Sequence, residues 1–164
     1  MDIFFFYITW LGSILILLPT TVLVSAVFRR VLHLTDMCLI LGGLLGSSLL
    51  AHVLKLLISR PRPTVVKDML VTMPTDFSFP SAHTAQATAF FIALALVTSR
   101  GLEAKIGLIV WVLCGFVIVA VGLSRVYLRV HYISDVIAGA ALGLVWVHLL
   151  NYLIRAMFSG GGHA

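Results

Sequence analysis

Five long apolar stretches follow one another along this chain, and the polar and charged residues gather in the short segments between them. Each stretch approaches the roughly 20 mostly apolar residues that a helix needs to cross a bilayer. Apolar and polar residues do not alternate as they do in barrel strands, and backbone in lipid must satisfy its own hydrogen bonds, so we expect helices. The predicted spans cover residues 3–28, 37–58, 82–98, 106–123 and 132–157.

The first stretch carries Gly12 and Pro19, which favour a bend. It has no basic segment at its start, and its apolar run is about twice as long as that of a signal peptide, so we interpret it as a retained span. The expected fold is an all-α, polytopic membrane bundle of about five transmembrane helices, or six if one stretch holds two spans. We expect one transmembrane domain over residues 1–158 and a flexible C-terminal tail over residues 159–164.

Composition excludes the main alternatives to a membrane protein. Of the 164 residues, 61% are hydrophobic and only 10% are charged, whereas a soluble domain has roughly 25% charged residues. The abundance of apolar residues also excludes intrinsic disorder. Cys38 and Cys114 both lie in apolar runs, so we expect thiols that face lipid or pack in the bundle and no disulfide framework.

Small residues recur at a spacing of four, at Gly42 and Gly46 and again at Gly139 and Gly143. In apolar helices such pairs allow two backbones to approach closely. Packing inside one bundle is the favoured interpretation, and a homodimer is the alternative.

The positive charges predict an orientation only when their surroundings are considered. The loops after the first and third spans and the C-terminal end carry Arg29, Arg30, Arg100, Lys105 and Arg155. The loops after the second and fourth spans carry Lys55, Arg60, Arg62, Lys67, Arg125 and Arg129. The second group clusters with histidines and prolines, as site residues do, so we discount it as a topology signal. The first group is then cytoplasmic, which predicts a multi-pass cytoplasmic (inner) membrane protein whose N-terminus and site face outward.

Three polar segments fall on the predicted outer side, and polar residues at a membrane boundary are candidates for function. The first contains Lys55, Arg60 and Arg62, and its two Arg-Pro steps end the second helix. Lys55 alone has a simpler explanation, because a lysine suits the C-terminal end of a membrane helix. His52, one turn earlier, is interpreted as a core histidine that bonds between helices.

The second segment, Pro80-Ser81-Ala82-His83, opens the third span. Proline and serine are common at helix starts, so a plain N-cap explains them. The same helix start also presents unpaired N–H groups and a positive dipole end, which bind anions. His83 is not needed for capping and remains a candidate for chemistry.

The third segment places His131 four residues before Asp135. If the fifth span begins near His131, the two side chains share one helix face. A carboxylate there can accept the imidazole Nδ1–H and leave Nε2 free to attack. A solvated polar pair is the alternative, and it weakens when a second histidine and several cations share the same side.

Metal binding is the chemical rival for two histidines and an aspartate. The nearby Lys55, Arg62 and Arg125 would repel a cation, and neither a cysteine nor a carboxylate pair lies near them. Arginine instead binds phosphate oxygens through paired N–H groups. Metal-free phosphoryl transfer needs such donors, an in-line nucleophile and an acid for the leaving group. We therefore expect an anion site with no metal and no cofactor.

Taken together, Lys55-x6-Arg62-Pro63, Pro80-Ser81-Ala82-His83 and Ser124-Arg125-x5-His131-x3-Asp135 resemble the three signatures of the type 2 phosphatidic acid phosphatase (PAP2) superfamily. The resemblance runs from about residue 55 to residue 135. It implies that His131 is a nucleophile that forms a phosphohistidine, that Asp135 orients it and that His83 protonates the leaving oxygen. It also implies that the phosphate is held by Lys55, Arg62, Ser81, Ala82 and Arg125, the turn at residues 81–83 contributing backbone N–H groups.

Ala82 departs from the family pattern, which usually has glycine at this position. The change is harmless if the residue is helical, whereas a positive φ would cost about 1 kcal/mol or more. The helical alternative is favoured because Pro80 and Ser81 are typical of a helix start. Arg60 and Arg129 are further candidates for a second phosphate or a lipid headgroup, with a plain surface role as the alternative.

Function follows from the site and its place at the membrane surface. No soluble domain accompanies the spans, so we expect a lipid phosphate that diffuses in the bilayer to be the partner, and no nucleic acid. The predicted activity is hydrolysis of a phosphomonoester or pyrophosphate of a lipid, and the sequence does not rank phosphatidylglycerophosphate, phosphatidate, polyprenyl pyrophosphate and lipid A phosphate. The alternatives are a lipid phosphotransferase that uses the same phosphohistidine and a non-enzymatic lipid or anion carrier, which would not need the oriented imidazole. A channel is disfavoured because no span carries a repeated polar stripe.

Overall fold

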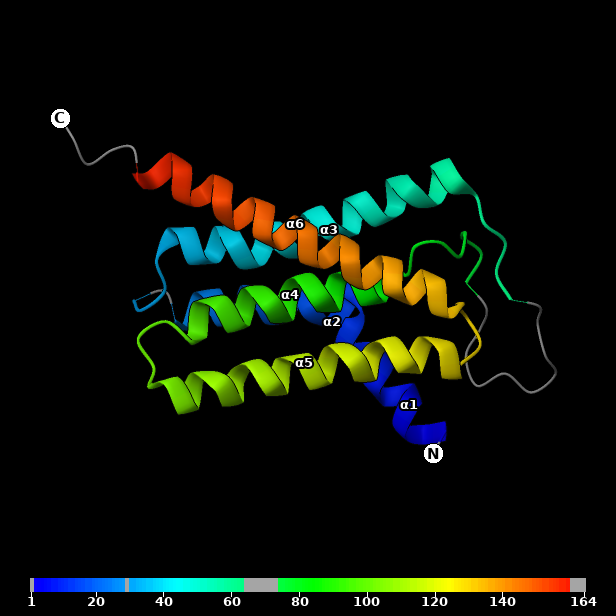
Figure 1. Ribbon diagram of the computed structural model, residues 1–164, viewed down its shortest axis with the longest axis horizontal. Helices are drawn as coiled ribbons and strands as arrows, with labels where there is room; N and C mark the ends of the chain where they lie inside the picture. Colours follow the sequence, from blue (N-terminus) through cyan, green and yellow to red (C-terminus); the bar gives the residue numbers. More distant parts are fainter. Residues whose placement is uncertain (1, 29, 64–73, 160–164) are drawn as a thin grey trace.

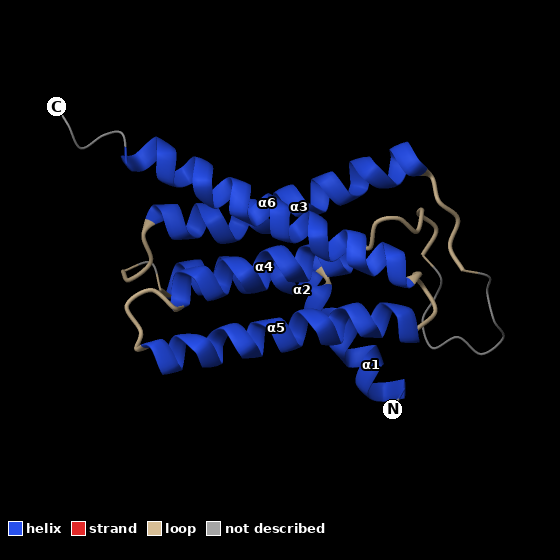
Figure 2. Ribbon diagram, in the orientation of Figure 1, coloured by secondary structure: helices blue, strands red, loops and turns tan. Residues whose placement is uncertain are grey.

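The computed structural model describes residues 2–28, 30–63 and 74–159, and no strand occurs among them. The helices are α1 (Asp2–Ile8), the 3-10 helix η1 (Thr9–Gly12), α2 (Ile14–Val27), α3 (Leu34–Ile58), α4 (Ala82–Thr98), α5 (Ala104–Tyr127) and α6 (Ile133–Ser159) (Figure 1). The predicted all-α bundle is therefore confirmed (Figure 2). Of the predicted flexible tail, residues 160–164 lie outside the described residues, as do Arg29 and Lys67 of the charge pattern.

The five predicted apolar stretches correspond in order to the helices. α3, α5 and α6 are each long and apolar enough to cross a membrane, and α4 is a shorter apolar helix. The first stretch is a bent pair, Ile3–Gly12 and Ile14–Val27, whose two parts meet at an angle of 55°. The start of α1 and the end of α6 lie at opposite ends of the bundle (Figure 1).

The bend in the first stretch lies at Gly12 and Ser13, while Pro19 sits inside α2. Ser13 is extended, with φ −84° and ψ 132°, and its side chain accepts a hydrogen bond from the Leu15 N–H at 3.3 Å as the N-cap of α2. A Cβ at residue 12 would lie 2.8 Å from the carbonyl oxygen of His83. Gly12 therefore allows the bent segment to pack closely against the start of α4, where the candidate site residue His83 lies.

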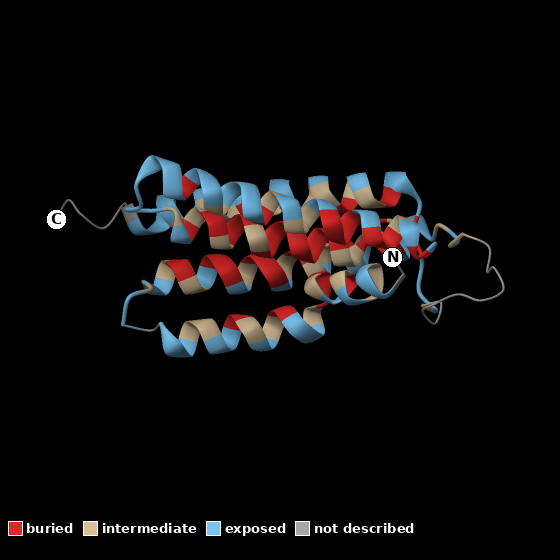
Figure 3. Cartoon of the chain, turned by 90° about the horizontal axis from the view of Figure 1, so that it is seen from below, coloured by how far each residue is buried: buried red, intermediate tan, exposed pale blue. Residues whose placement is uncertain are grey.

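α4 lies in the interior of the bundle, where it packs against α3, α5 and α6. Its sequence is rich in alanine and threonine, and these small side chains are buried on most of its faces. The outward faces of α5 and α6 instead expose large apolar side chains such as Ile109, Phe116 and Val145. Figure 3 shows the same division between buried inner faces and exposed outer faces. Exposed apolar surface of this extent is typical of a protein that lipid surrounds.

The glycine pairs allow close contacts between helices inside the bundle, as the favoured interpretation predicted. A Cβ at Gly139 would lie 2.5 Å from the carbonyl oxygen of Ser81, so α6 passes close to α4. At Gly46 a Cβ would meet the indole ring of Trp146, and that indole Nε1–H donates to the carbonyl oxygen of Gly42 at 3.0 Å. The two cysteines are free thiols, Cys38 exposed and Cys114 buried.

The three polar segments meet at one end of the bundle. The chain leaving α3, the chain entering α4 and the turn between α5 and α6 all lie at the end opposite to the α4–α5 connection (Figure 1). The backbone N–H of Ser81 donates to the carbonyl oxygen of Asp135 at 3.0 Å, and the N–H of Ser78 donates to that of Arg60 at 2.8 Å. These bonds confirm the predicted convergence of segments that lie far apart in sequence.

Candidate active site

His131 lies in the turn between α5 and α6, two residues before the last helix begins. Its backbone N–H donates to the carbonyl oxygen of Arg125 at 3.3 Å. Its Nδ1 lies 3.4 Å from Oδ2 of Asp135, a carboxylate in the first turn of α6 that is entirely buried. The predicted pairing is present, although His131 precedes the helix where the sequence suggested a shared helix face.

The neighbours of His131 fix its tautomer. Nε2 lies 3.3 Å from NH1 of Arg62, and a guanidinium group can only donate hydrogen bonds. The hydrogen-bond network therefore assigns the lone pair to Nε2 and the hydrogen to Nδ1, on the side of Asp135. This is the tautomer that a nucleophilic Nε2 requires.

The surroundings of His131 also keep its imidazole neutral. Burial lowers its pKa to about 2, and the positive charges of Arg125 and Arg62 act in the same direction. Val130, the residue directly before His131, lines a cavity together with His83. A neutral imidazole carries the lone pair that attack on phosphorus needs.

A cationic group formed by Lys55 and Arg62 surrounds Asp76, a residue in the chain that leads to α4. Lys55 Nζ lies 3.0 Å from Asp76 Oδ2, and Arg62 Nε donates to the Asp76 carbonyl oxygen at 2.9 Å. Burial alone would raise the pKa of Asp76, but the hydrogen bonds from Arg62 and Lys55 outweigh it and lower the pKa. Asp76 is therefore an anion held by two of the predicted phosphate ligands.

Asp135 is held by Arg60 of the first segment, by Ser78 in the chain before α4 and by the backbone just before α6. Arg60 NH1 donates to Oδ1 at 2.7 Å, and the Ser78 hydroxyl donates to Oδ2, which also accepts the Tyr132 N–H at 3.0 Å. The Arg60 guanidinium stacks over the Tyr132 ring, 4.2 Å from its centroid. Arg60 thus contacts the carboxylate behind His131.

A cavity of about 530 Å³ lies beside this cluster, and Arg60, the exposed Arg129 and His131 all line it. The two arginines that the sequence suggested as headgroup contacts therefore share one opening with the imidazole of His131.

The second segment begins α4 as predicted. Ser81 is the N-cap, and its side chain accepts hydrogen bonds from the N–H and the hydroxyl of Thr84 at 3.5 and 2.9 Å. Ala82 is the first residue of α4 and is not among the residues with positive φ. The favoured alternative is therefore confirmed, and alanine in place of glycine brings no backbone strain here. His83 follows in the first turn of α4.

Arg125, in the last turn of α5, is almost completely buried. Its NH1 donates to the hydroxyl of Thr9 in η1 at 2.6 Å, whereas its Nε has no hydrogen-bond partner among the described residues. Arg125 and His83 line a cavity of about 180 Å³ together with Thr9 and Trp10. A buried cationic donor without a partner fits an anion in this cavity.

Sequence reasoning missed Asp76, Ser78 and Thr9. The first two precede Pro80 in an alternating polar and aromatic run, and Asp76 is one of only six acidic residues, which is a signal that could have been used. Thr9 lies in an apolar stretch and gave no signal. The interpretation of His52 as a core histidine is wrong, because its side chain is exposed.

The donor set is that of an anion site. Across residues 2–28, 30–63 and 74–159, no group of three or more His, Cys, Asp or Glu side chains is placed to hold a metal ion. The positively charged groups around His131 include Lys55, Arg60, Arg62 and Arg125, and Arg129 lines the same cavity as His131. Their arrangement suits the oxygens of a phosphate group.

Comparison with known proteins agrees with this geometry. Residues 36–158 match the profile of the PAP2 superfamily, which is well over half of the chain. The chain therefore belongs to the PAP2 superfamily, and it is a multi-pass membrane protein.

Individual relatives are similar over much of the chain. Phosphatidylglycerophosphatase B of Bacillus subtilis (strain 168) is 36% identical over 153 residues, which cover 90% of this chain and 70% of that protein. A lipid A 1-phosphatase of Rhizobium etli is 38% identical over 117 residues, which cover 67% of this chain and 46% of that protein. The crystal structure of the transmembrane PAP2 type phosphatidylglycerolphosphate phosphatase from Bacillus subtilis superposes with a TM-score of 0.82 at 33% identity, covering 99% of this chain and 78% of that chain.

Proposed function

We propose that this protein is a metal-independent membrane lipid phosphatase that hydrolyses a phosphomonoester or pyrophosphate of a lipid through a phosphohistidine at His131. The observation that carries the proposal is the position of the His131 ring. Nδ1 faces the buried carboxylate of Asp135, and Nε2 faces Arg62 in a cationic site. An imidazole held in this tautomer beside phosphate-binding cations has the arrangement that nucleophilic phosphoryl transfer needs.

The reaction has two steps. In the first, the lone pair of His131 Nε2 forms a bond to phosphorus while the ester P–O bond breaks, and His83 gives a proton to the departing oxygen. The Nδ1 hydrogen of the positively charged ring remains directed at Asp135. In the second step, a water molecule gives a proton to His83 and attacks phosphorus, which breaks the P–N bond and restores neutral His131.

The phosphate oxygens would be held by the side chains of Lys55, Arg62 and Arg125. Ser81 and the N–H groups at the start of α4, including that of Ala82, add uncharged donors and the positive end of the helix dipole. In this structure the Asp76 carboxylate accepts hydrogen bonds from the side chains of Lys55 and Arg62. A phosphate that enters the site has to take over these bonds from the carboxylate.

The lipid character of the substrate follows from the surroundings of the site. The helices that carry it expose apolar side chains, and the cavities beside His131 and His83 include apolar residues such as Val126, Ile133 and Phe6. Because relatives named above act on phosphatidylglycerophosphate and on lipid A, these are the first lipid phosphates to test. The charge pattern supports a site on the outer face of the cytoplasmic membrane.

Phosphate release from a panel of lipid phosphates in detergent tests the activity, with purified wild-type protein and His131→Ala. We expect release with at least one lipid phosphate and none with the variant, although its unfolding temperature remains close to that of the wild type. Vanadate, which mimics five-coordinate phosphorus, should inhibit, and EDTA should not. Activity of His131→Ala near the wild-type level would overturn the role of His131, and a loss with EDTA that added metal restores would indicate a metal-dependent reaction.

A further inference from the structure

Two separate cavities adjoin the candidate active site. The larger cavity, of about 530 Å³, is lined by Arg60 and His131, and it lies toward Asp135 because Arg60 bonds that carboxylate. The smaller cavity, of about 180 Å³, is lined by His83 and Arg125. Among the residues that the structure describes, the two cavities have no lining residue in common.

The smaller cavity lies on the side of His131 from which attack on phosphorus proceeds. Arg62 NH1 lies 3.3 Å from Nε2 of His131 and donates to the carbonyl oxygen of Val130 at 2.8 Å. Val130 lines the smaller cavity, and neither Arg62 nor Val130 lines the larger one. The nucleophilic nitrogen therefore faces the side where His83 lies, while Nδ1 faces the Asp135 carboxylate beside the larger cavity.

The chemistry of phosphoryl transfer constrains where the lipid part of the substrate lies. The attacking and leaving atoms lie roughly in line, on opposite sides of phosphorus. In the reaction proposed above, the attacking atom is Nε2 of His131, and the leaving oxygen has to come within hydrogen-bond reach of the acid, His83. This oxygen belongs to the lipid. The part of the lipid next to the scissile bond therefore lies at the smaller cavity, which His83 lines.

The remaining lining of the smaller cavity suits a lipid. Phe6 of α1 and Trp10 of η1 contribute two aromatic rings from the bent N-terminal segment. Trp10 is 41% exposed, and the nearby Ile3 and Tyr7 are also exposed, so the cavity borders the apolar outer surface of the bundle. Tryptophan is common at the headgroup level of membranes, because its ring is apolar and its N–H is polar. A cavity of about 180 Å³ is smaller than a site for a whole ligand, so the acyl chains extend beyond it into the bilayer.

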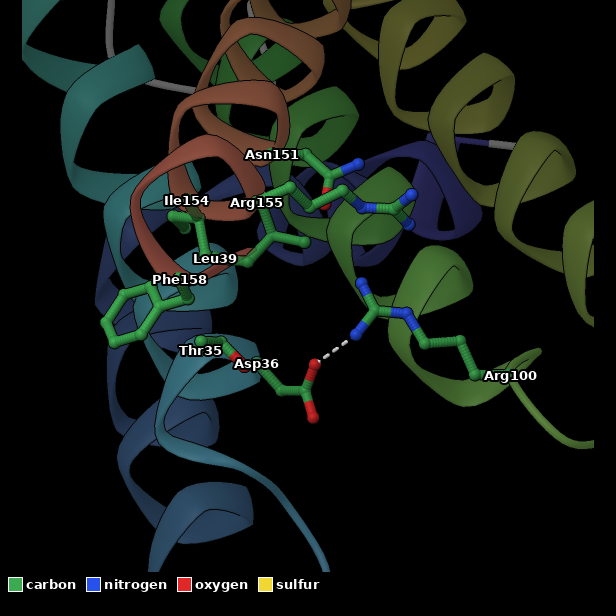
Figure 4. A pocket seen from close by; sticks show the side chains of 8 residues that line it. All are labelled: Thr35, Asp36, Leu39, Arg100, Asn151, Ile154, Arg155 and Phe158. Carbon is green, nitrogen blue, oxygen red and sulfur yellow. Dashed lines mark hydrogen bonds and ion pairs between the residues drawn. The ribbon is translucent and has the colours of Figure 1, made fainter. Parts of the chain in front are cut away.

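A further cavity, at the end of the bundle opposite to His131, offers no alternative place for the reacting lipid. Its described lining includes Arg100, Asn151 and no histidine. Figure 4 shows Arg100 bonded to the carboxylate of Asp36 within it. A lipid bound there is remote from the nucleophile, so the position of the reacting lipid is decided between the two cavities beside His131.

We infer that Phe6 and Trp10 bind the lipid part of the substrate, and that Trp10 is a specificity-determining residue that favours a lipid phosphate over a free phosphate. The inference rests on the proposed function and deepens it, because the acid His83 identifies the side of the leaving group. The close approach of Gly12 to the His83 carbonyl oxygen holds the bent segment, and with it both aromatic rings, beside the phosphate site.

Steady-state kinetics in detergent micelles test the inference, on the long-chain lipid phosphate of the panel that the wild type hydrolyses fastest. We expect Trp10→Ala to raise KM about 10-fold with little change in kcat, because the lost contact is equally strong before and during the reaction. Vanadate has no lipid part, so its inhibition constant should remain that of the wild type. Trp10→Phe keeps an aromatic ring and should recover most of the wild-type KM.

Trp111→Ala is the matched control, because Trp111 is a similarly exposed indole on α5, at 37%, that lines neither cavity. It should keep the wild-type KM. If Trp10→Ala does not fold, Phe6→Ala should show the same rise in KM. A wild-type KM or weaker vanadate inhibition in Trp10→Ala, or an equal rise in Trp111→Ala, would overturn the inference alone.

The opposite placement of the lipid has its own signature. Ile133→Ala shortens an apolar side chain of the larger cavity. A larger rise in KM for Ile133→Ala than for Trp10→Ala would place the lipid in that cavity and overturn the inference. If the wild type releases no phosphate from any lipid of the panel, the proposed function fails and the inference fails with it.

Discussion

Nδ1 of His131 lies 3.4 Å from Oδ2 of Asp135, and the carboxylate is completely shielded from solvent. Replacing Asp135 by asparagine keeps the size of the side chain but removes the charge that stabilises the imidazolium ring. We expect kcat to fall by a factor of about 10 to 10,000 with little change in KM, less than the complete loss in His131→Ala. Steady-state kinetics on a lipid phosphate checks this, and wild-type kcat in Asp135→Asn would contradict it.

Thr9 contacts Arg125 across the bundle, with the hydroxyl accepting from NH1 at 2.6 Å. Thr9→Val keeps the shape and removes the acceptor, which leaves the buried guanidinium less well placed for a phosphate. We expect kcat/KM to fall about 10-fold or more, as for the loss of a hydrogen bond to a charged group. Thr20→Val is the matched control, because Thr20 bonds only within α2, to the carbonyl oxygen of Ile16. Equal activity of the two variants would show that Thr9 does not position Arg125.

Asp76 competes with phosphate for the cations at Lys55 and Arg62. Asp76→Asn removes this competing negative charge, so we expect vanadate to inhibit at about one-tenth of the wild-type concentration, a change of about 1.4 kcal/mol in binding. Glu103→Gln, which removes a carboxylate in the connection before α5, is the control and should leave inhibition unchanged. Weaker inhibition of Asp76→Asn would mean that Asp76 holds the cations in place for phosphate.

Burial of neutral His131 makes the stability of the protein depend on pH. Its pKa is lowered by burial, and further by Arg125 and Arg62, to about 2, whereas a histidine in the unfolded chain has a pKa near 6.5. Below about pH 6.5 the unfolded chain therefore binds a proton that the folded protein excludes, so stability present above this pH is lost as pH falls.

By about pH 5 this loss amounts to about 2 kcal/mol, and His131→Asn should not show it. Thermal unfolding at about pH 7.5 and about pH 5 measures the difference, with His148→Asn, at an exposed histidine of α6, as the control. The wild type and His148→Asn should lose more stability on acidification than His131→Asn does. Equal losses in all three proteins would contradict a buried neutral His131.

The sequence predicted the elements well because the signals were local. Apolar runs of membrane length gave the order of the helices, and the start of α4 at Ala82 and the end of α3 at Ile58 were predicted at the residues where they occur. The Pro80-Ser81 and Arg-Pro steps act through their own backbones, so no tertiary information is needed to place these boundaries.

The remaining features depend on contacts between distant residues. The bend lies at Gly12 and not at Pro19, because Gly12 meets the His83 carbonyl, which no local pattern reveals. Arg60 was a candidate for a second phosphate or a headgroup, with a surface role as the alternative, and its bond to the Asp135 carboxylate, 75 positions away, was not foreseen. Thr9 reaches Arg125 from 116 positions away and lies in an otherwise apolar run. Such pairings are products of the bundle and cannot be read from spacing.

The most direct test of the account is to trap the covalent intermediate. Wild-type protein is mixed with a lipid phosphate labelled on its phosphorus, quenched with alkali during turnover, and mapped by mass spectrometry of its peptides. We predict a phosphoryl group on His131, at a level that falls as substrate runs out, and none in His131→Ala. A phosphoryl group on another residue, or turnover by His131→Ala, would contradict the nucleophilic role of His131.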